Sequence, residues 1–294
     1  MADSPTMRRR ALLFGSGGMI GSALAKQFTG PHLSAFSHQD LDITDYVSLE
    51  RSFLKHKPEI VLNAAAFTKV DDCEKFREAA FLSNAQAPGH LAALSARQGA
   101  LLVHLSTDYV FDGANERLYQ ENDPANPVNY YGVTKWEGEK RIVASGCTYL
   151  ILRTSWIFGR NGDNFVKKLL RRALAGAKLQ APEDQIGSPT YANDVAAAVL
   201  RLVSLGVGGF FHFANRGSCS RLEQARTVLQ IYGLNNSVEA VKNDDLHLPA
   251  KRPRFSVMDT SRYAEVTSQM PRTWQQGIAE YVAYLKQNEA ELRS

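Results

Sequence analysis

The sequence predicts an α/β protein with a doubly wound parallel sheet and a smaller C-terminal α/β domain. Short apolar runs alternate with stretches of helical periodicity up to residue 158, which is typical of a parallel sheet covered by helices on both faces. The first apolar run ends in a cluster of glycines, where a helical pattern begins. Several later apolar runs end in small or hydroxyl-bearing residues, at the sheet edge where such folds bind ligands.

Each element of the first half follows from the period of its apolar residues. The expected strands are Arg10 to Phe14, His32 to Phe36, Glu59 to Ala66, Ala100 to Leu105 and Thr148 to Trp156. The expected helices are Met19 to Phe28, Val47 to Lys55, Glu74 to Gln98 with a break around Pro88, and Tyr131 to Ser145. Since crossovers between parallel strands are right-handed almost without exception, this order yields a doubly wound sheet.

The regular alternation fades after residue 158, so we expect a nucleotide-binding domain over 1–158 and a substrate domain over 159–294. A later segment near 186–204 is a candidate for returning to the first domain. The expected helices of this half are Asn164 to Ala175, Asn193 to Val203 and Arg221 to Tyr232, with a short apolar piece at Gly209 to Phe213.

Composition excludes several classes of protein. Of the 294 residues, 44% are hydrophobic and 22% are charged, as in ordinary globular proteins. The net charge of +4 is small for this length, and the basic runs at 8–10 and 167–172 are short, which argues against a nucleic-acid partner. The cysteines Cys73, Cys147 and Cys219 lie far apart, and no CxxC, HxH or HxxxH pair occurs, so we expect neither a disulfide framework nor a metal site.

The first residues resemble a signal peptide only faintly. Arg8, Arg9 and Arg10 precede a short apolar run, but that run stops at Gly15, whereas a signal peptide needs about 7–15 apolar residues. No stretch approaches the ~20 apolar residues of a membrane span. We therefore expect a cytoplasmic protein without a membrane partner.

The glycine cluster predicts a dinucleotide site of the Rossmann type. Gly15, Gly18 and Gly21 recur at every third position between the first strand and the first helix. Glycines allow a tight turn and a close approach of the backbone to a pyrophosphate, and the helix N-terminus offers free N–H groups to the anion.

The choice between NADPH and NADH depends on the end of the second strand. An NAD-selective site has Asp or Glu about 20 residues beyond the glycines, on the ribose 2′-hydroxyl. Here the strand ends in Ser37 and His38, which could tolerate a 2′-phosphate, so NADPH is expected to be usable and is a candidate for the preferred cofactor. Asp40 and Asp42 follow; they are candidates for capping the helix before Val47, and Asp42 also for a bond to the adenine amino group.

The catalytic candidates are Tyr131, Lys135 and Thr107. Tyr131 and Lys135 are four residues apart in an expected helix and so share one face. A lysine ammonium lowers the pKa of a nearby phenol, which makes tyrosine a usable general acid for a ketone that receives hydride. Thr107 follows the fourth strand, where its hydroxyl can donate to a carbonyl oxygen as charge develops there. At the end of the third strand, Asn63 is followed by alanines 64–66, whose small side chains leave room for the cofactor.

These motifs together resemble the extended short-chain dehydrogenase/reductases, and most closely the dTDP-4-dehydrorhamnose reductase family. The resemblance rests on the glycine loop 15–21, residues 63–66, 106–113, 129–135, 138–140 and 153–156, and the later pair Arg252 and Pro253. It covers nearly the whole chain, from about Ala11 to Tyr284, and is strongest in the first half.

The resemblance implies an activity and a set of site residues. The activity is the NAD(P)H-dependent reduction of the C4 ketone of dTDP-4-dehydro-L-rhamnose to dTDP-L-rhamnose, with Tyr131 as proton donor assisted by Lys135 and Thr107. The cofactor, NADPH or NADH, is expected to contact Gly15, Gly18, Met19, Ile20, Gly21, Ser37, Asp42, Ile43, Ala64, Ala65, Ala66, Phe67, Thr68, Tyr131 and Lys135. The dTDP-linked sugar is expected to contact Thr107, Asp108 and Trp156, and Arg252 is our own candidate for its diphosphate.

Two departures from the family leave questions open. Ser37 stands where family members carry an acid, which puts NAD preference in doubt. Some members form magnesium-bridged dimers through glutamates, but Ser22 and Ala23 follow the glycine loop here, so no metal is expected and both a monomer and a homodimer remain open. The alternative functions are reduction of another nucleotide-linked 4-keto-6-deoxy sugar and a non-catalytic regulatory subunit of the methionine adenosyltransferase β type. Thr107, Tyr131 and Lys135 favour an enzyme.

Overall fold

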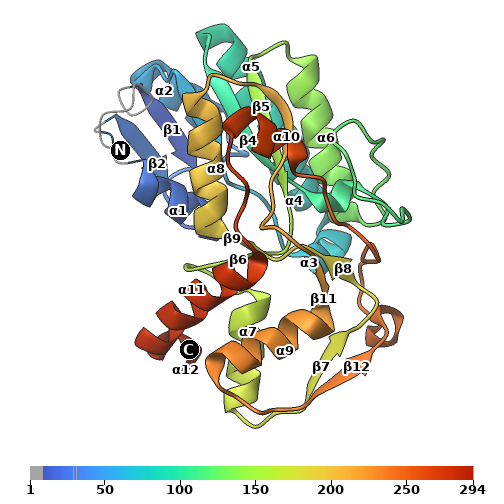
Figure 1. Ribbon diagram of the computed structural model, residues 1–294. Helices are drawn as coiled ribbons and strands as arrows, with labels where there is room; N and C mark the ends of the chain where they lie inside the picture. The colour runs from blue at the N-terminus through green and yellow to red at the C-terminus, as the bar shows by residue number, and fades with distance from the viewer. Residues whose placement is uncertain (1–8, 29, 31, 294) are drawn as a thin grey trace.

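Six parallel strands form the large sheet in the computed structural model, which describes residues 9–28, 30 and 32–293 (Figure 1). The strand order is β10-β5-β4-β3-β1-β2. The strands are β1 (Ala11–Phe14), β2 (Leu33–Phe36), β3 (Ile60–Asn63), β4 (Leu101–Thr107), β5 (Tyr149–Thr154) and β10 (Gly209–His212). The predicted doubly wound α/β fold is thereby confirmed.

Helices cover both faces of this sheet. Ala11 and Leu13 of β1 point into a core shared with α1 (Met19–Gln27) and α8 (Ala192–Ser204). Leu12 and Phe14 point into a second core, which is shared with α2 (Tyr46–His56), α5 (Ala87–Gln98) and α6 (Tyr130–Ala144). All four side chains are buried, which explains why the strand is a continuous apolar run instead of an alternating one.

A smaller body with its own core lies at one end of the sheet, in the lower half of Figure 1. Its helices are α7 (Phe165–Leu174), α9 (Arg221–Tyr232), α11 (Trp274–Gln287) and α12 (Ala290–Arg293). Its short strands pair as β6 (Ile157–Phe158) with β9 (Thr190–Tyr191), β7 (Leu179–Pro182) with β12 (Val238–Val241), and β8 (Ile186–Gly187) with β11 (Cys219–Ser220).

The chain returns to the large sheet in its second half. Helix α8 packs against α1, and β10 pairs with β5 at the sheet edge. The short helices η4 (Asn243–Leu246) and α10 (Ser261–Thr267) complete the later half. Tyr263 of α10 packs into the same core as α1 and α8. The strands of the large sheet and the helices that pack on it therefore come from both sides of residue 158.

The predicted helix at 74–98 is wrong in its details. Four consecutive helical pieces occupy this region: α3 (Val70–Lys75), α4 (Arg77–Phe81), the π-helical η2 (Leu82–Gln86) and α5. The break lies at Phe76, and the helix runs on through Pro88 in the first turn of α5. Because a proline has no N–H and its ring crowds the preceding turn, the wider π-helical turn before it accommodates Pro88.

Within the described ranges, every helix is too short or too polar to cross a lipid bilayer. The arginine at position 8, which was weighed as part of a signal peptide, lies outside the described residues.

Candidate active site

The glycine loop brings β1, α1 and the end of β3 into close contact. Gly15 has a φ of +81°, and a Cβ there would lie 2.6 Å from the backbone nitrogen of Ala65. A Cβ on Gly21 would overlap the carbonyl oxygen of Gly15. The N-cap residue of α1 is Gly18, which has no side chain to accept from the first N–H groups of the helix and leaves them open to an anion.

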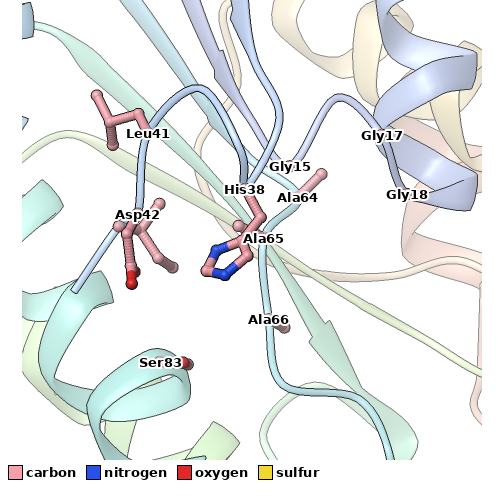
Figure 2. Close-up of a pocket in the computed structure, with 11 residues that line it drawn as sticks. Gly15, Gly17, Gly18, His38, Leu41, Asp42, Ala64, Ala65, Ala66 and Ser83 are labelled. Carbon is pink, nitrogen blue, oxygen red and sulfur yellow. The ribbon is translucent and has the colours of Figure 1, made fainter. Parts of the chain in front are cut away.

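A cavity of about 250 Å³ lies in front of this loop. Figure 2 shows it between the loop, the segment after β2 that carries His38 and Asp42, the alanines after β3, and Ser83 of η2. Its lining includes the predicted cofactor residues Gly15, Gly18, Asp42, Ile43, Ala64, Ala65 and Ala66. It also includes Gly17, His38, Leu41 and Ser83, which were not among the predicted contacts. The small residues and the uncapped helix fit an elongated anionic cofactor such as a dinucleotide.

The other predicted cofactor residues lie outside this lining. Met19, Ile20 and Gly21 form the first turn of α1. Phe67 follows the alanines, and its backbone is held by the side chain of Asn84, which accepts from the Phe67 N–H at 2.8 Å. No described contact of Thr68 helps to define the site.

Asp40 changes the sequence argument about cofactor choice. The backbone N–H and the hydroxyl of Ser37 both donate to the Asp40 carboxylate, at 2.8 and 2.6 Å. These bonds lower the pKa of Asp40, so an ionised acid does stand at the end of β2. Capping of α2 also differs from the expectation, because Asp45 accepts from the N–H groups of Val47 and Ser48. Asp42 accepts from Thr44 instead.

Thr107 and Tyr131 meet at the carboxyl edge of the sheet. Thr107 ends β4, and Tyr131 lies in the first turn of α6. Tyr109 lies in the 3₁₀ turn η3 (Asp108–Val110). The Tyr131 ring packs edge-on against the Tyr109 ring, with centroids 5.9 Å apart. Burial raises the pKa of Tyr131, while a hydrogen bond with Thr107 acts in the opposite direction.

The amino group of Lys135 bonds two groups on β4. Its Nζ donates to the carbonyl oxygen of Leu105 at 2.6 Å and lies 3.2 Å from Nε2 of His104. Burial lowers the pKa of Lys135 to about 8, and the charge of Glu139 opposes this. The pKa of Tyr131 is raised by burial in this arrangement, in contrast to the lowering expected from Lys135. His104 was missed in the sequence, although a histidine inside an otherwise apolar strand was a signal.

Asp108 lies behind Thr107 and is held from both sides. The Thr107 hydroxyl donates to its Oδ1 at 3.0 Å, and the Ser256 hydroxyl donates to its Oδ2 at 2.6 Å. Burial raises the pKa of Asp108 to about 6. Ser256 comes from the last quarter of the chain, and nothing in its local sequence indicated this contact.

The two remaining substrate candidates differ in their surroundings. Trp156 has a φ of +47°, an unfavourable backbone conformation of a kind that clusters at functional sites. The Arg221 guanidinium lies 3.5 Å from the centroid of its ring. Arg252 forms a bidentate ion pair with Asp71 at 2.6 and 2.7 Å, so its charge is already neutralised. Arg221, which sequence reasoning missed, bonds Gln224 and has no carboxylate ion pair within the described part of the chain.

A buried ion pair holds α6 against β4 and β5. Arg153 of β5 makes two bonds to Glu139 of α6, at 3.0 and 2.7 Å, and the Ser106 hydroxyl donates to the same carboxylate. This pair ties α6 to β4 and β5, which gives a structural reason for the motifs around residues 138–140 and 153–156.

Comparison with known proteins agrees with this geometry. The family model described as RmlD substrate binding domain matches residues 9–287. The chain is 38% identical to the spore coat polysaccharide biosynthesis protein SpsK of Bacillus subtilis, with 93% of this chain and 96% of the relative covered. It is 37% identical to a dTDP-4-dehydrorhamnose reductase of Mycolicibacterium smegmatis, with 94% and 86% covered. A dTDP-4-keto-6-deoxy-D-glucose reductase of Streptomyces niveus is 33% identical, with 97% and 100% covered.

A solved structure extends the likeness to three dimensions. The dTDP-4-dehydrorhamnose reductase of Bacillus anthracis, crystallised in complex with NADP, superimposes with a TM-score of 0.91 at 31% identity, covering 94% of this chain and 99% of that one. The predicted resemblance is therefore confirmed. In sequence and in fold, over nearly all of its length, the chain belongs to the family of the RmlD substrate binding domain, the dTDP-4-dehydrorhamnose reductase family of extended short-chain dehydrogenases.

Proposed function

We propose that this protein is an NAD(P)H-dependent reductase of dTDP-linked 4-keto-6-deoxy sugars, and that its substrate is dTDP-4-dehydro-L-rhamnose, which it reduces at C4. The observation that carries the proposal is the meeting of Thr107 and Tyr131 at the sheet edge that also bears the glycine-loop cavity. A ketone held there would have a proton donor beside it and a cofactor site next to it.

The cofactor residues are proposed from the cavity. The glycine loop and the N-terminus of α1 would hold the pyrophosphate, and Ala64, Ala65 and Ala66 leave room for the ribose. When bound, the reduced nicotinamide supplies the hydride. Both NADPH and NADH are retained as cofactors, although the Asp40 carboxylate would repel a 2′-phosphate at Ser37.

Tyr131 is the proposed proton donor. Because burial raises the pKa of its phenol, Tyr131 holds its proton at neutral pH and can deliver it to the oxygen of the reduced ketone. Thr107 would orient that oxygen, and Lys135 would stabilise the tyrosinate left behind. Asp108 and Trp156 are proposed contacts of the sugar, and Arg221 is a better candidate than Arg252 for the diphosphate because Asp71 already neutralises Arg252.

A second candidate substrate is another dTDP-linked 4-keto-6-deoxy sugar. The relative from Streptomyces niveus, named for a keto-glucose substrate, favours this alternative. Both substrates would use the same catalytic residues and would differ only in the contacts made by the smaller body.

The test is oxidation of NADPH and of NADH by the purified protein with each 4-keto sugar, followed by NMR identification of the product. We expect turnover with dTDP-4-dehydro-L-rhamnose and formation of dTDP-L-rhamnose. Tyr131→Phe is expected to lower kcat by about 10²–10⁴ and to leave dinucleotide affinity nearly unchanged, because a positioned general acid contributes about that much. Dinucleotide binding without turnover of any keto sugar would contradict the proposal.

A further inference from the structure

Asn63, His104 and Lys135 form a buried hydrogen-bonded chain behind the catalytic edge. Asn63 ends β3 and is the direct neighbour of His104 in β4. Their exposed fractions are 2% for Asn63, 0% for His104 and 2% for Lys135. Asn63 Nδ2 lies 3.0 Å from His104 Nδ1, and Lys135 Nζ lies 3.2 Å from His104 Nε2.

The orientation of the Asn63 amide is fixed by the backbone. Its Oδ1 accepts from the Ala65 N–H at 3.2 Å. If the amide were rotated by half a turn, its NH₂ group would face that N–H, and two donors would meet in a buried site. The NH₂ group must therefore face His104 and donate to it, so Nδ1 of His104 carries a lone pair.

This orientation determines the proton position on His104. A neutral imidazole with an accepting Nδ1 has its proton on Nε2, which faces Lys135. An ammonium group has no lone pair, so His104 can donate to Lys135 only when the lysine is a neutral amine. The neutral amine still donates one of its own hydrogens to the carbonyl oxygen of Leu105.

We propose that Asn63 and His104 are positioning residues that hold Lys135 as a neutral amine in the protein without ligands, by fixing the His104 proton on Nε2. Burial shifts Lys135 toward the neutral amine, lowering its pKa to about 8, and the Nε2 proton of His104 that faces the amine disfavours the ammonium further, so that the neutral form prevails near neutral pH. Burial likewise holds the pKa of His104 well below its usual value, so His104 stays neutral.

The surrounding charges are consistent with this state. The groups that face Lys135 or its helix are His104 of β4, Tyr131 and Glu139 of α6, Arg153 of β5, Asp108 of η3 and Cys73 of α3. Only Glu139 favours the ammonium, and its carboxylate is bound to Arg153. The functional consequence, which rests on the proposed function, is that Lys135 must gain a proton before it can stabilise the Tyr131 phenolate.

The first experiment reads the tautomer of His104 directly. In ¹⁵N-histidine-labelled protein without ligands, long-range ¹⁵N–¹H spectra at neutral pH should show His104 protonated on Nε2. His212 is a control in the same spectrum, because its Nδ1 lies 3.1 Å from the carbonyl oxygen of Tyr119 and must carry the proton. The His104 signals are assigned with His104→Gln, or through contacts to Leu105 if that variant does not fold. A proton on Nδ1 of His104, or a doubly protonated ring, overturns the proposal.

The second experiment reverses the direction of the hydrogen bonds from Asn63 to Lys135. It uses Asn63→Asp, because aspartate has nearly the same shape as asparagine. A carboxylate accepts on both sides, so the His104 proton should move to Nδ1, and Nε2 should accept from a Lys135 ammonium. The Lys135 pKa, followed by the ¹³Cε and ¹⁵Nζ shifts, should rise by about one unit or more, a tenfold change in proton affinity. In Asn63→Asp/His104→Gln the added charge remains but the imidazole is gone. An equal rise in that double variant overturns the proposal, because the charge would then act directly.

The pH dependence of the rate connects the hydrogen-bonded residues Asn63, His104 and Lys135 to the reaction. If Lys135 must be protonated for turnover, the rate falls as pH rises through its pKa, and Asn63→Asp should move this alkaline limb upward with KM little changed. An alkaline limb that stays fixed while the Lys135 pKa moves overturns the functional consequence alone. Absence of any turnover contradicts the proposed function, while the two NMR experiments still decide the state of Lys135.

Discussion

Replacing Asp108 by asparagine is expected to stabilise the folded protein above about pH 6 and to change little near pH 4. The Asp108 side chain is 2% exposed and accepts hydrogen bonds from the hydroxyls of Thr107 and Ser256. Asparagine has the same shape and can bond both hydroxyls, because the Ser256 hydroxyl can rotate from donor to acceptor. The substitution therefore removes a buried charge without removing its partners.

The magnitude follows from the pKa of Asp108. Burial raises this pKa from 3.8 to about 6, so the folded chain binds the proton more tightly than the unfolded chain. The contribution of Asp108 to stability is fully present below the unfolded pKa and is lost as pH rises through the folded pKa. A difference of about two pH units corresponds to about 3 kcal/mol at neutral pH, and asparagine should restore most of it.

The assay is urea unfolding of both proteins between about pH 4 and pH 8. The difference in the free energy of unfolding should grow from near zero to about 3 kcal/mol, rising mainly between the unfolded pKa of 3.8 and the folded pKa of about 6 and levelling off above it. Asp45→Asn is a control that should show little slope in this range, because hydrogen bonds from Ser48 lower the pKa of Asp45 below its ordinary 3.8 and its titration lies below the range of the assay. A stability difference for Asp108→Asn that does not vary with pH would refute the reasoning.

Three further predictions concern the parts around the site. Gly21→Ala should cost about 1–3 kcal/mol in thermal unfolding and weaken dinucleotide binding, because the added methyl group overlaps the Gly15 carbonyl; unchanged binding in a fluorescence titration would contradict this. Arg153→Met should lower the free energy of unfolding by about 3–5 kcal/mol in urea, since it leaves Glu139 charged and buried. Adding Glu139→Gln should recover part of the loss, and no recovery would count against an unpaired charge as the cause. Asp40→Asn should shift the ratio of dissociation constants toward NADPH, and an equal ratio before and after would show that this carboxylate does not contribute to cofactor choice.

Much of the fold could be predicted from the sequence because its signals are local. The period of apolar residues sets each strand and helix of the large sheet, and the bounds of β1, β2 and α6 lie within a residue or two of the expected ones. The glycines at 15, 18 and 21 fix a tight turn wherever the rest of the chain goes. The ends of β4 and β5 lie within two residues of the expected ones, which located Thr107 at the sheet edge, whereas β3 ends at Asn63, three residues before its expected end.

Only the tertiary structure decided which groups the polar side chains meet. The four-residue spacing placed Lys135 on the same helix face as Tyr131, but the buried amino group needed hydrogen-bond partners and found them on β4, at Leu105 and His104. Arg252 looked free in the sequence and is neutralised by Asp71, far away in the chain. Burial and charge pairing depend on neighbours that are distant in sequence, and no local pattern encodes them. The sequence by itself therefore determined the order of the elements and the edge that bears the site, whereas packing determined the protonation and the partners of the residues there.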